Sequence, residues 1–262
     1  MISKYRLIKL TQKNRSFLSK KIKNIEKDIY YPLGDDFFKI DHGTSYFDFF
    51  ERLGEMHYWC LFDKRKKRLI ATFCAILREI NSKKVWYICD LKVIKEYRGL
   101  GISKLIIKRI LFWNLFNYRI FAAYCVSMDS TNTKRLPYNK IKKISFGILK
   151  KIYKIHIYSL TKKEYFSNYE IFSNYYLTHT DGNKNLILKS NSKSIELLHL
   201  SKNKYPIVNE DHIDNNSVIM ISCFANSKLD LKLTEIDIKN ISYASVLSCF
   251  MKEPPNVYTD EI

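Results

Sequence analysis

The stretch from residue 85 to residue 117 constrains the fold more than any other part of the chain. It reads VWYICDLKVIKEYRGLGISKLIIKRILFWNLFN. Over residues 85–93, the set Val85, Tyr87, Cys89, Leu91 and Val93 alternates with Trp86, Ile88, Asp90 and Lys92, which is the period of two typical of a strand. Apolar residues then recur over residues 102–113 with a spacing close to the helical period of 3.6. The chain has seven glycines, and two of them, Gly99 and Gly101, fall between these two elements.

A glycine turn at this place has a physical meaning. Glycine is needed where φ is positive or where the backbone must approach something bulky. A turn that opens a helix also points free N–H groups outward at the positive end of the helix dipole, which favours a pyrophosphate. The patterns of a dinucleotide-binding loop and of a P-loop are both absent from this turn. The alternative interpretation is a strand-to-helix turn that merely uses glycine.

The turn resembles the acyl-CoA pyrophosphate loop of the GNAT acyltransferase superfamily, which reads Arg/Gln-x-x-Gly-x-Gly/Ala after the fourth strand. Arg98, Gly101 and Ser103 stand at the three defining positions, and Ser103 departs from the usual Gly or Ala. The resemblance covers about residues 1–160. It implies an α+β (mixed α/β) fold in which a twisted, mostly antiparallel central sheet is flanked by helices.

The resemblance also implies direct transfer of an acyl group, most simply from acetyl-CoA, to a small-molecule or protein amine, with no metal. The residues that would bind acetyl-CoA are Leu91, Val93, Arg98, Gly99, Leu100, Gly101, Ile102, Ser103 and Asn132. Asp90, just ahead of the turn, is the expected general base, and the alternative is a structural aspartate that holds a bulge. Tyr138 is the expected acid for the departing thiolate, and the alternative is a packing or surface tyrosine.

Three departures from the family pattern keep a second class of function open. Ser103 adds a hydroxyl where backbone should approach phosphate, Pro137 would disturb a helix interior, and no Gly-Phe closes the following helix. They favour a catalytically inactive GNAT-like module that holds an anionic partner, either nucleic acid or an acidic protein. A third possibility is an acyltransferase whose donor is an acidic acyl carrier protein.

The net charge limits the kinds of partner that the chain can bind, and the cysteine pattern indicates its cellular compartment. The net charge of +19 comes from residues 1–150, since residues 151–262 hold equal numbers of basic and acidic residues. A basic N-terminal half suits anionic partners, and a lysine-coated solvated surface is the alternative. The six cysteines are widely spaced without a CxxC pair, which indicates buried thiols in a reducing compartment. No charged-then-apolar leader or membrane-spanning run is present, so we expect a cytoplasmic protein without a membrane partner.

The remaining residues, 161–262, are expected to form a C-terminal α/β extension packed on the domain of residues 1–160. The extension could be a degenerate acyltransferase-like half. Its pattern predicts a helical segment over residues 161–176, a buried strand over residues 218–224 and a helix over residues 236–251. In the N-terminal region, the family order predicts two helices between the first two strands.

Overall fold

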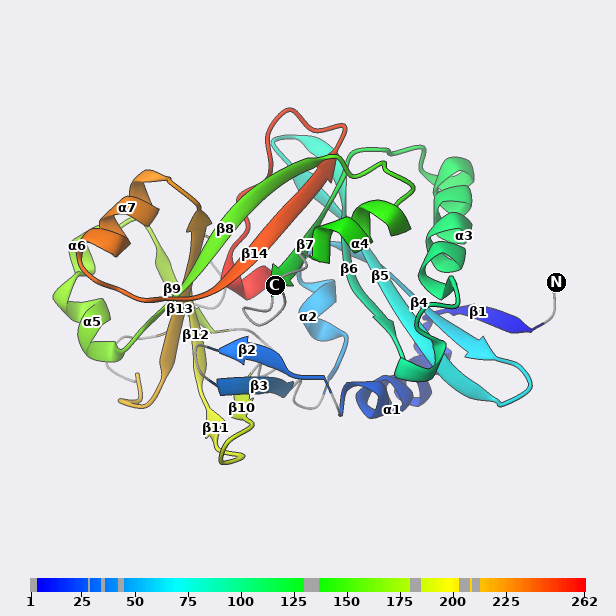
Figure 1. Cartoon of the computed structure of the whole chain (residues 1–262), viewed down its shortest axis with the longest axis horizontal. Coiled ribbons are helices and arrows are strands. Elements are labelled where there is room, and N and C mark those ends of the chain that lie inside the picture. The colour runs from blue at the N-terminus through cyan, green and yellow to red at the C-terminus, as the bar shows by residue number, and fades with distance from the viewer. Residues whose placement is uncertain are drawn as a thin grey trace.

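The computed structural model describes residues 4–27, 29–33, 36–41, 45–129, 137–179, 185–202, 208 and 213–262. Its main feature is a ten-stranded sheet that runs through both parts of the chain (Figure 1). In spatial order its strands are β1 (Tyr5–Lys9), β4 (Glu55–Asp63), β5 (Arg68–Ile80), β6 (Lys83–Val93), β7 (Ala123–Asp129), β14 (Asn240–Cys249), β8 (Lys151–Leu160), β13 (Val218–Phe224), β12 (Leu197–Ser201) and β9 (Tyr176–His179). A smaller sheet has the order β11 (Ser194–Ile195), β10 (Asn185–Leu188), β3 (Asp36–Asp41) and β2 (Tyr31–Leu33).

Most neighbouring strands of the large sheet are antiparallel. The parallel pairs are β6 with β7 and β12 with β13. The helices are α1 (Arg15–Glu26), α2 (Asp48–Glu51), α3 (Ile102–Asn117), α4 (Pro137–Ile144), α5 (Lys162–Ser167), α6 (Tyr169–Phe172) and α7 (Lys228–Glu235). The 3₁₀ turns are η1 (Gln12–Asn14), η2 (Lys95–Tyr97) and η4 (Thr259–Glu261). This arrangement confirms the predicted fold class of a mostly antiparallel sheet flanked by helices.

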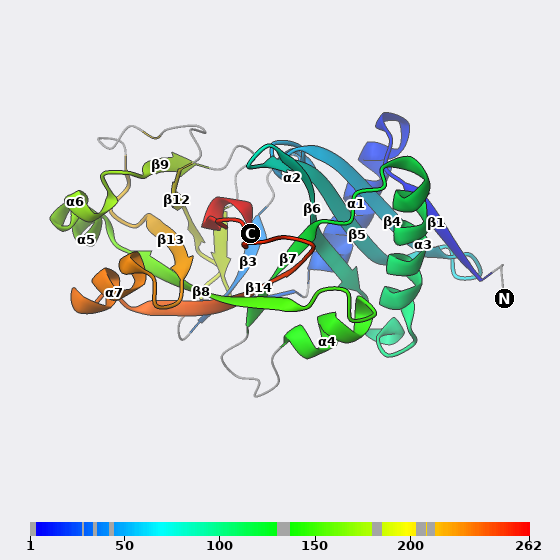
Figure 2. The ribbon, with the colours of Figure 1, turned by 90° about the horizontal axis from the view of Figure 1, so that it is seen from above.

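The helices of the N-terminal region cover the two faces of the sheet separately. α3 buries Ile102, Ile106 and Ile110 against β4, β5 and β6, while α1 buries Leu18 and Ile22 in the core on the opposite face. α4 lies beside α3, and α2 lies on the side of α1 (Figures 1 and 2). In the described part of the chain, no helix is long and apolar enough to cross a membrane.

The prediction of a helix over residues 236–251 was wrong. Residues 228–235 form the short helix α7, and the following segment is the strand β14, inserted between β7 and β8. Neighbours on both edges and both faces bury Ala244, Val246 and Leu247 completely. A strand buried in this way has no alternation of apolar and polar residues, so periodicity cannot tell it from a buried helix.

Between the first two strands of the large sheet, β1 and β4, lie the two expected helices, α1 and the single-turn helix α2. The strands β2 and β3 of the smaller sheet, which were not predicted, lie between these helices. The helical segment expected over residues 161–176 is divided into α5 and α6 and ends where β9 begins. The strand expected over residues 218–224 is confirmed as β13. The division of the chain at residue 160 stays a prediction, and strands on either side of it share one sheet.

Candidate active site

The two parallel strands β6 and β7 separate in the middle of the sheet. They pair over three residues only, Trp86–Ile88 of β6 with Ala123–Cys125 of β7. Beyond this point, β6 continues to pair with β5, and β7 continues to pair with β14. The edge of β6 that faces β7 is therefore not covered by the β6–β7 ladder over Cys89–Val93. Backbone N–H and C=O groups on such an edge can bind a ligand.

The glycine turn follows directly after this open edge. Gly99 has a φ of +82° and Gly101 a φ of +74°, and Gly101 is the N-cap residue of α3. A Cβ atom on either glycine would meet no other atom within 4 Å. The glycines are thus required by their backbone angles, and the space in front of the turn is open. Leu100 is exposed and Ile102 is buried, so the turn lies at the surface while the helix that it opens is anchored in the core.

Arg98 connects the turn to the end of β6, because its Nε donates a hydrogen bond of 3.0 Å to the carbonyl oxygen of Val93. Among the described residues, no side chain caps the start of α3 by a hydrogen bond at its N-cap. The first N–H groups of a helix have no partner within that helix, and they lie at the positive end of its dipole. Ser103, in the first turn of α3, is half-buried.

Asp90 lies at a β-bulge, one residue after the open edge begins. The ladder between β5 and β6 shifts here, so that Asp90 and Leu91 of β6 oppose Phe73 of β5. Asp90 has a φ of +52°, a conformation that aspartate tolerates better than most residues. Thr72 holds the bulge, because its Oγ1 donates a hydrogen bond of 3.0 Å to the carbonyl oxygen of Asp90.

The bulge turns the Asp90 carboxyl towards the face opposite α3, where five polar side chains meet. Its Oδ2 accepts hydrogen bonds from the hydroxyls of Tyr46 (3.0 Å) and Tyr58, and its Oδ1 pairs with the ammonium of Lys92. Lys92 also pairs with Glu26 and donates a 2.9 Å hydrogen bond to the Tyr46 hydroxyl. The Asp90 side chain is 6% exposed, so this network is largely removed from water.

The two tyrosine hydroxyls of this network keep their protons. Burial, reinforced by the Asp90 charge, raises the pKa of Tyr46 and Tyr58 well above the ordinary tyrosine value, so both phenols remain hydrogen-bond donors. The two phenols and the Lys92 ammonium hold the Asp90 carboxyl in a fixed position, where it can accept a proton.

Sequence reasoning selected Asp90 as a candidate and did not predict the other four side chains of this network. Glu26 comes from α1, Tyr46 from the segment before α2, and Tyr58 from β4. Lys92 lies two residues after Asp90, and its place in the sequence is compatible with an exposed lysine. No local signal joins residues so far apart in the chain, because only the sheet order and the packing of α1 bring them together.

The two remaining predicted site residues cannot be compared with the structure in the same detail. Asn132 lies outside the described residues. Tyr138 is the second residue of α4, whereas the family pattern places the acid about two turns into the helix. Pro137 is the first residue of α4, a position where its missing N–H has no helical partner to lose. The expected disturbance of a helix interior was therefore wrong.

An apolar cavity of about 600 Å³ lies further along the same two elements, between α3, the paired part of β6 and β7, and residues 145–151. Ile107 of α3 lines it one turn after Ser103, and Ile88 of β6 lines it two residues before Asp90. Asn114 also lines the cavity, where it accepts a 3.0 Å hydrogen bond from Trp86 Nε1 and donates a 2.7 Å hydrogen bond to the carbonyl oxygen of Ile120.

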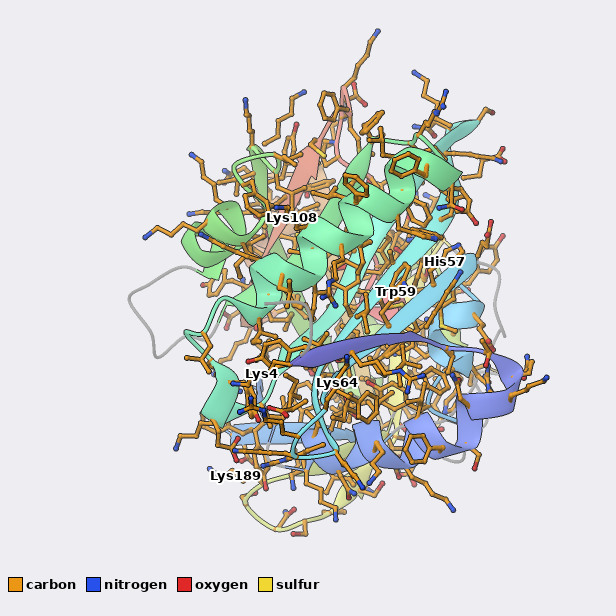
Figure 3. The ribbon with its side chains drawn as sticks, turned by 90° about the vertical axis from the view of Figure 1, so that its right-hand side faces the viewer. Lys4, His57, Trp59, Lys64, Lys108 and Lys189 are labelled. Atoms are coloured by element: carbon orange, nitrogen blue, oxygen red, sulfur yellow. The ribbon has the colours of Figure 1, made fainter. Side chains whose placement is uncertain are left out.

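An aromatic cluster packs beneath the C-terminal end of α3. His57 and Trp59 of β4 lie under the helix (Figure 3), and the His57 ring lies 4.9 Å from that of Trp113. Its Nε2 lies 2.9 Å from Glu55 Oε1. Its buried Nδ1 has no hydrogen-bond partner in the described part of the chain, which suits a neutral ring. Burial lowers the pKa of His57.

No group of three or more potential metal ligands occurs among the described residues. All six cysteines are free thiols, and burial raises the pKa of Cys60, Cys125 and Cys223 above the ordinary thiol value. A raised thiol pKa lowers the fraction of nucleophilic thiolate, so the geometry gives no support to covalent catalysis by these cysteines.

Comparison with known proteins supports the family resemblance that the glycine turn indicated. Residues 20–135 match the model of the acetyltransferase (GNAT) family, so the resemblance is confirmed for this part of the chain. Protein L340 of Acanthamoeba polyphaga mimivirus, itself uncharacterised, is 25% identical over 231 residues. The match covers 79% of this chain and 65% of that relative, so the chain spans less than two thirds of its length.

Two solved acyltransferase structures have a fold similar to that of this chain. N-myristoyltransferase of Saccharomyces cerevisiae, solved with bound myristoyl-CoA, has a TM-score of 0.50 and 11% identity, and the match covers 97% of this chain and 81% of that one. An aminoglycoside 6'-N-acetyltransferase of Acinetobacter baumannii matches 54% of this chain and 90% of its own, with 15% identity and a TM-score of 0.37. At 11% identity the first match concerns the fold alone, and it includes both the N-terminal and the C-terminal region.

Proposed function

We propose that this chain, whose residues 20–135 match the GNAT acetyltransferase family, is an acyl-CoA-dependent N-acyltransferase that transfers the acyl group directly to an amine. The observation that carries the proposal is the separation of β6 from β7 directly before the double-glycine turn that opens α3. This combination offers one open strand edge for an extended arm and one helix N-terminus for a pyrophosphate.

The backbone would supply most of the donor site. N–H groups of the turn and of the first residues of α3 would bind the pyrophosphate, with Gly99 and Gly101 keeping the approach open. N–H groups on the open edge of β6, around Leu91 and Val93, would polarise the thioester carbonyl. Donors that are fixed in advance stabilise the negative charge that develops on this oxygen in the transition state.

Asp90 would accept the proton of the attacking amine, directly or through one water molecule. The amine nitrogen attacks the thioester carbon, the C–S bond breaks, and the nitrogen proton passes to the carboxylate. Tyr46, Tyr58 and Lys92 would position that carboxylate, and the acceptor would attack as the neutral amine. Protonation of the thiolate by Tyr138 and contact of the CoA arm with Asn132 stay predictions.

The apolar cavity favours a long-chain donor over acetyl-CoA. Its nearest lining residue on β6, Ile88, precedes Leu91 by three residues, and its volume of about 600 Å³ lies within the usual range of roughly 300–1,000 Å³ for small-molecule sites. An acetyl group would leave such a cavity empty. The fold likeness to an N-myristoyltransferase that binds myristoyl-CoA is consistent with a fatty acyl chain.

The test is calorimetric titration of CoA, without an acyl group, into the wild type and two variants at two salt concentrations. Gly101→Arg places a side chain in front of the turn and should abolish saturable binding. Gly147→Arg is the matched control, because Gly147 also has a positive φ (+75°) and open space around its Cβ but lies outside the turn. Equal affinities of both variants would contradict the proposed site.

The alternative functions are separated by the same experiment. A GNAT-like module that holds nucleic acid or an acidic protein would bind no CoA, and its binding of polyanions would weaken steeply as salt rises. A transferase that takes its donor from an acyl carrier protein would bind the acylated carrier protein more tightly than CoA. Binding of CoA that survives moderate salt and is lost in Gly101→Arg favours the acyl-CoA enzyme.

A further inference from the structure

The cavity opens at a surface with an unusual number of exposed aromatic side chains. Three phenylalanines that line it are also largely exposed: Phe121 (51%), Phe146 (53%) and Phe250 (76%). The rings of Phe121 and Phe250 are 6.4 Å apart, although one follows α3 and the other follows β14. The two loops that hold them lie at the end of the molecule where α3 and β14 finish (Figure 1).

The outer face of α3 also has exposed apolar side chains. Phe112 (62% exposed), Leu115 (44%) and Phe116 (68%) project from the C-terminal half of the helix, and the rings of Phe112 and Phe116 are 5.1 Å apart. The opposite face of α3 is already buried in the core. A surface helix normally has a polar outer face, so an apolar outer face marks an interaction site.

We call these six residues the apolar rim: Phe112, Leu115, Phe116, Phe121, Phe146 and Phe250. The part of the sequence that contains most of the rim is basic. Between Glu96 and Glu164 the chain has fifteen Lys and Arg residues, and Asp129 is its single acidic residue. Lys108 precedes Phe112 by one turn on the exposed side of α3 (Figure 3), and Lys150 is an exposed residue of the cavity lining.

We propose that the apolar rim is a docking surface for a lipid bilayer that contains anionic lipids. Phenylalanine and leucine side chains can enter the boundary between headgroups and acyl chains, while Lys and Arg bind anionic headgroups. The charge selects this occupant over a second copy of the chain, because two such surfaces would bring like charges together. The proposal departs from the sequence-based expectation of no membrane partner, and it does not depend on acyl transfer.

Docking would also place the mouth of the cavity against the lipid. Phe121, Phe146 and Phe250 line the cavity and belong to the rim, so the opening lies within the proposed contact area. A fatty chain could then pass between the bilayer and the cavity without crossing water, where each exposed methylene group is unfavourable.

The test is co-sedimentation of the full chain with vesicles of phosphatidylcholine alone and of phosphatidylcholine mixed with phosphatidylserine. The wild type should bind the mixed vesicles and bind the neutral ones much more weakly. Phe112→Ser with Phe116→Ser should lower partitioning about tenfold or more. Lys108→Ala with Lys150→Ala should lower it about 25-fold, at roughly fivefold for each charge.

Matched controls separate docking from the general attraction of a basic protein to anionic lipid. Phe166→Ser with Tyr169→Ser removes two exposed aromatic residues from α5 and α6, at the other end of the molecule (Figure 1). Lys13→Ala with Lys20→Ala removes two exposed lysines near or on α1. Both control pairs should bind mixed vesicles within about twofold of the wild type.

Three outcomes would overturn the proposal. They are the absence of binding to mixed vesicles, an equal loss of binding in rim and control variants, and unchanged binding in both rim pairs. The thermal unfolding temperature of each variant, measured beforehand, shows that a loss of binding is not a loss of folding. Because every substituted side chain is exposed, we expect each variant to fold.

Discussion

The two ends of α3 offer different chemical groups to a ligand: backbone N–H groups at the N-terminal end and apolar side chains at the C-terminal end. At its N-terminal end lie Gly99 and Gly101, with positive φ values and open space around them, followed by the first N–H groups of the helix, which have no acceptor within the helix. At its C-terminal end lie an apolar cavity and exposed phenylalanines. The first end suits phosphates and the second suits hydrocarbon. One helix thus offers complementary surfaces to the two chemically different parts of a fatty acyl-CoA molecule.

The largest expected effect concerns Asp90, the proposed general base on β6. Asp90→Asn keeps the shape of the side chain and removes the proton acceptor, so kcat should fall by about 10²–10⁴-fold. The dissociation constant of CoA should stay within about threefold of the wild-type value, because the pyrophosphate site is unchanged. Steady-state kinetics of thiol release with a saturating amine measures the first quantity, and calorimetry measures the second.

Comparison of Lys92→Met with Asp90→Asn tests whether Asp90 accepts the proton or only stabilises the bulge. If Asp90 is the base and Lys92 positions it, the Lys92 variant should retain part of kcat and shift the pH profile, whereas Asp90→Asn should remove the fall in rate at low pH that comes from protonation of the base. Equal kcat losses with unchanged pH profiles in the two variants would indicate that Asp90 only holds the bulge.

A smaller effect, on stability, tests the hydrogen bonds of Asn114 beside the apolar cavity at the C-terminal end of α3. Asn114→Leu removes the acceptor of Trp86 Nε1 and the donor to the Ile120 carbonyl, and it leaves the buried indole N–H and the partly buried carbonyl without this hydrogen bond. The free energy of unfolding should fall by about 2–4 kcal/mol. Asn117→Leu, at an exposed position in the last turn of α3, should change it by no more than about 0.5 kcal/mol. Urea denaturation of both variants measures the difference.

The smallest effect concerns pH. Burial lowers the pKa of His57 in the folded state, so the unfolded chain takes up this proton first as the pH falls. The contribution of His57 to stability is complete above the ordinary histidine value of 6.5 and is lost as the pH falls below it. His57→Gln should therefore have a melting temperature that falls less steeply than that of the wild type between pH 7 and pH 5. Parallel slopes would contradict the assignment.

The N-terminal end of α3 could be predicted from the sequence because its signal is local. Two glycines, a preceding strand and a following helix lie within one short stretch. The bulge at Asp90 could not, because it depends on the register with Thr72 and Phe73 in β5. Nor could the pairing of Glu26 with Lys92, since only the packing of α1 against the sheet brings the two residues together.

The C-terminal region shows the limit of periodicity. Residues 240–249 form a strand with partners on both edges, and the sequence pattern predicted a helix there. The cavity was missed for a related reason. Its lining comes from α3, β6, β7, residues 145–151 and the end of β14, so no single stretch reveals it. The phenylalanines of the apolar rim were equally compatible with a buried core.

The most direct test of the account is a calorimetric series with CoA, octanoyl-CoA and myristoyl-CoA on the wild type and on Ala123→Phe, which fills the cavity from β7. In the wild type, each added methylene group should tighten binding by about fourfold until the cavity is full. In Ala123→Phe, the affinity for CoA should be unchanged and the dependence on chain length should disappear. Equal affinity of the wild type for all three ligands would contradict the claim that the two ends of α3 serve one donor.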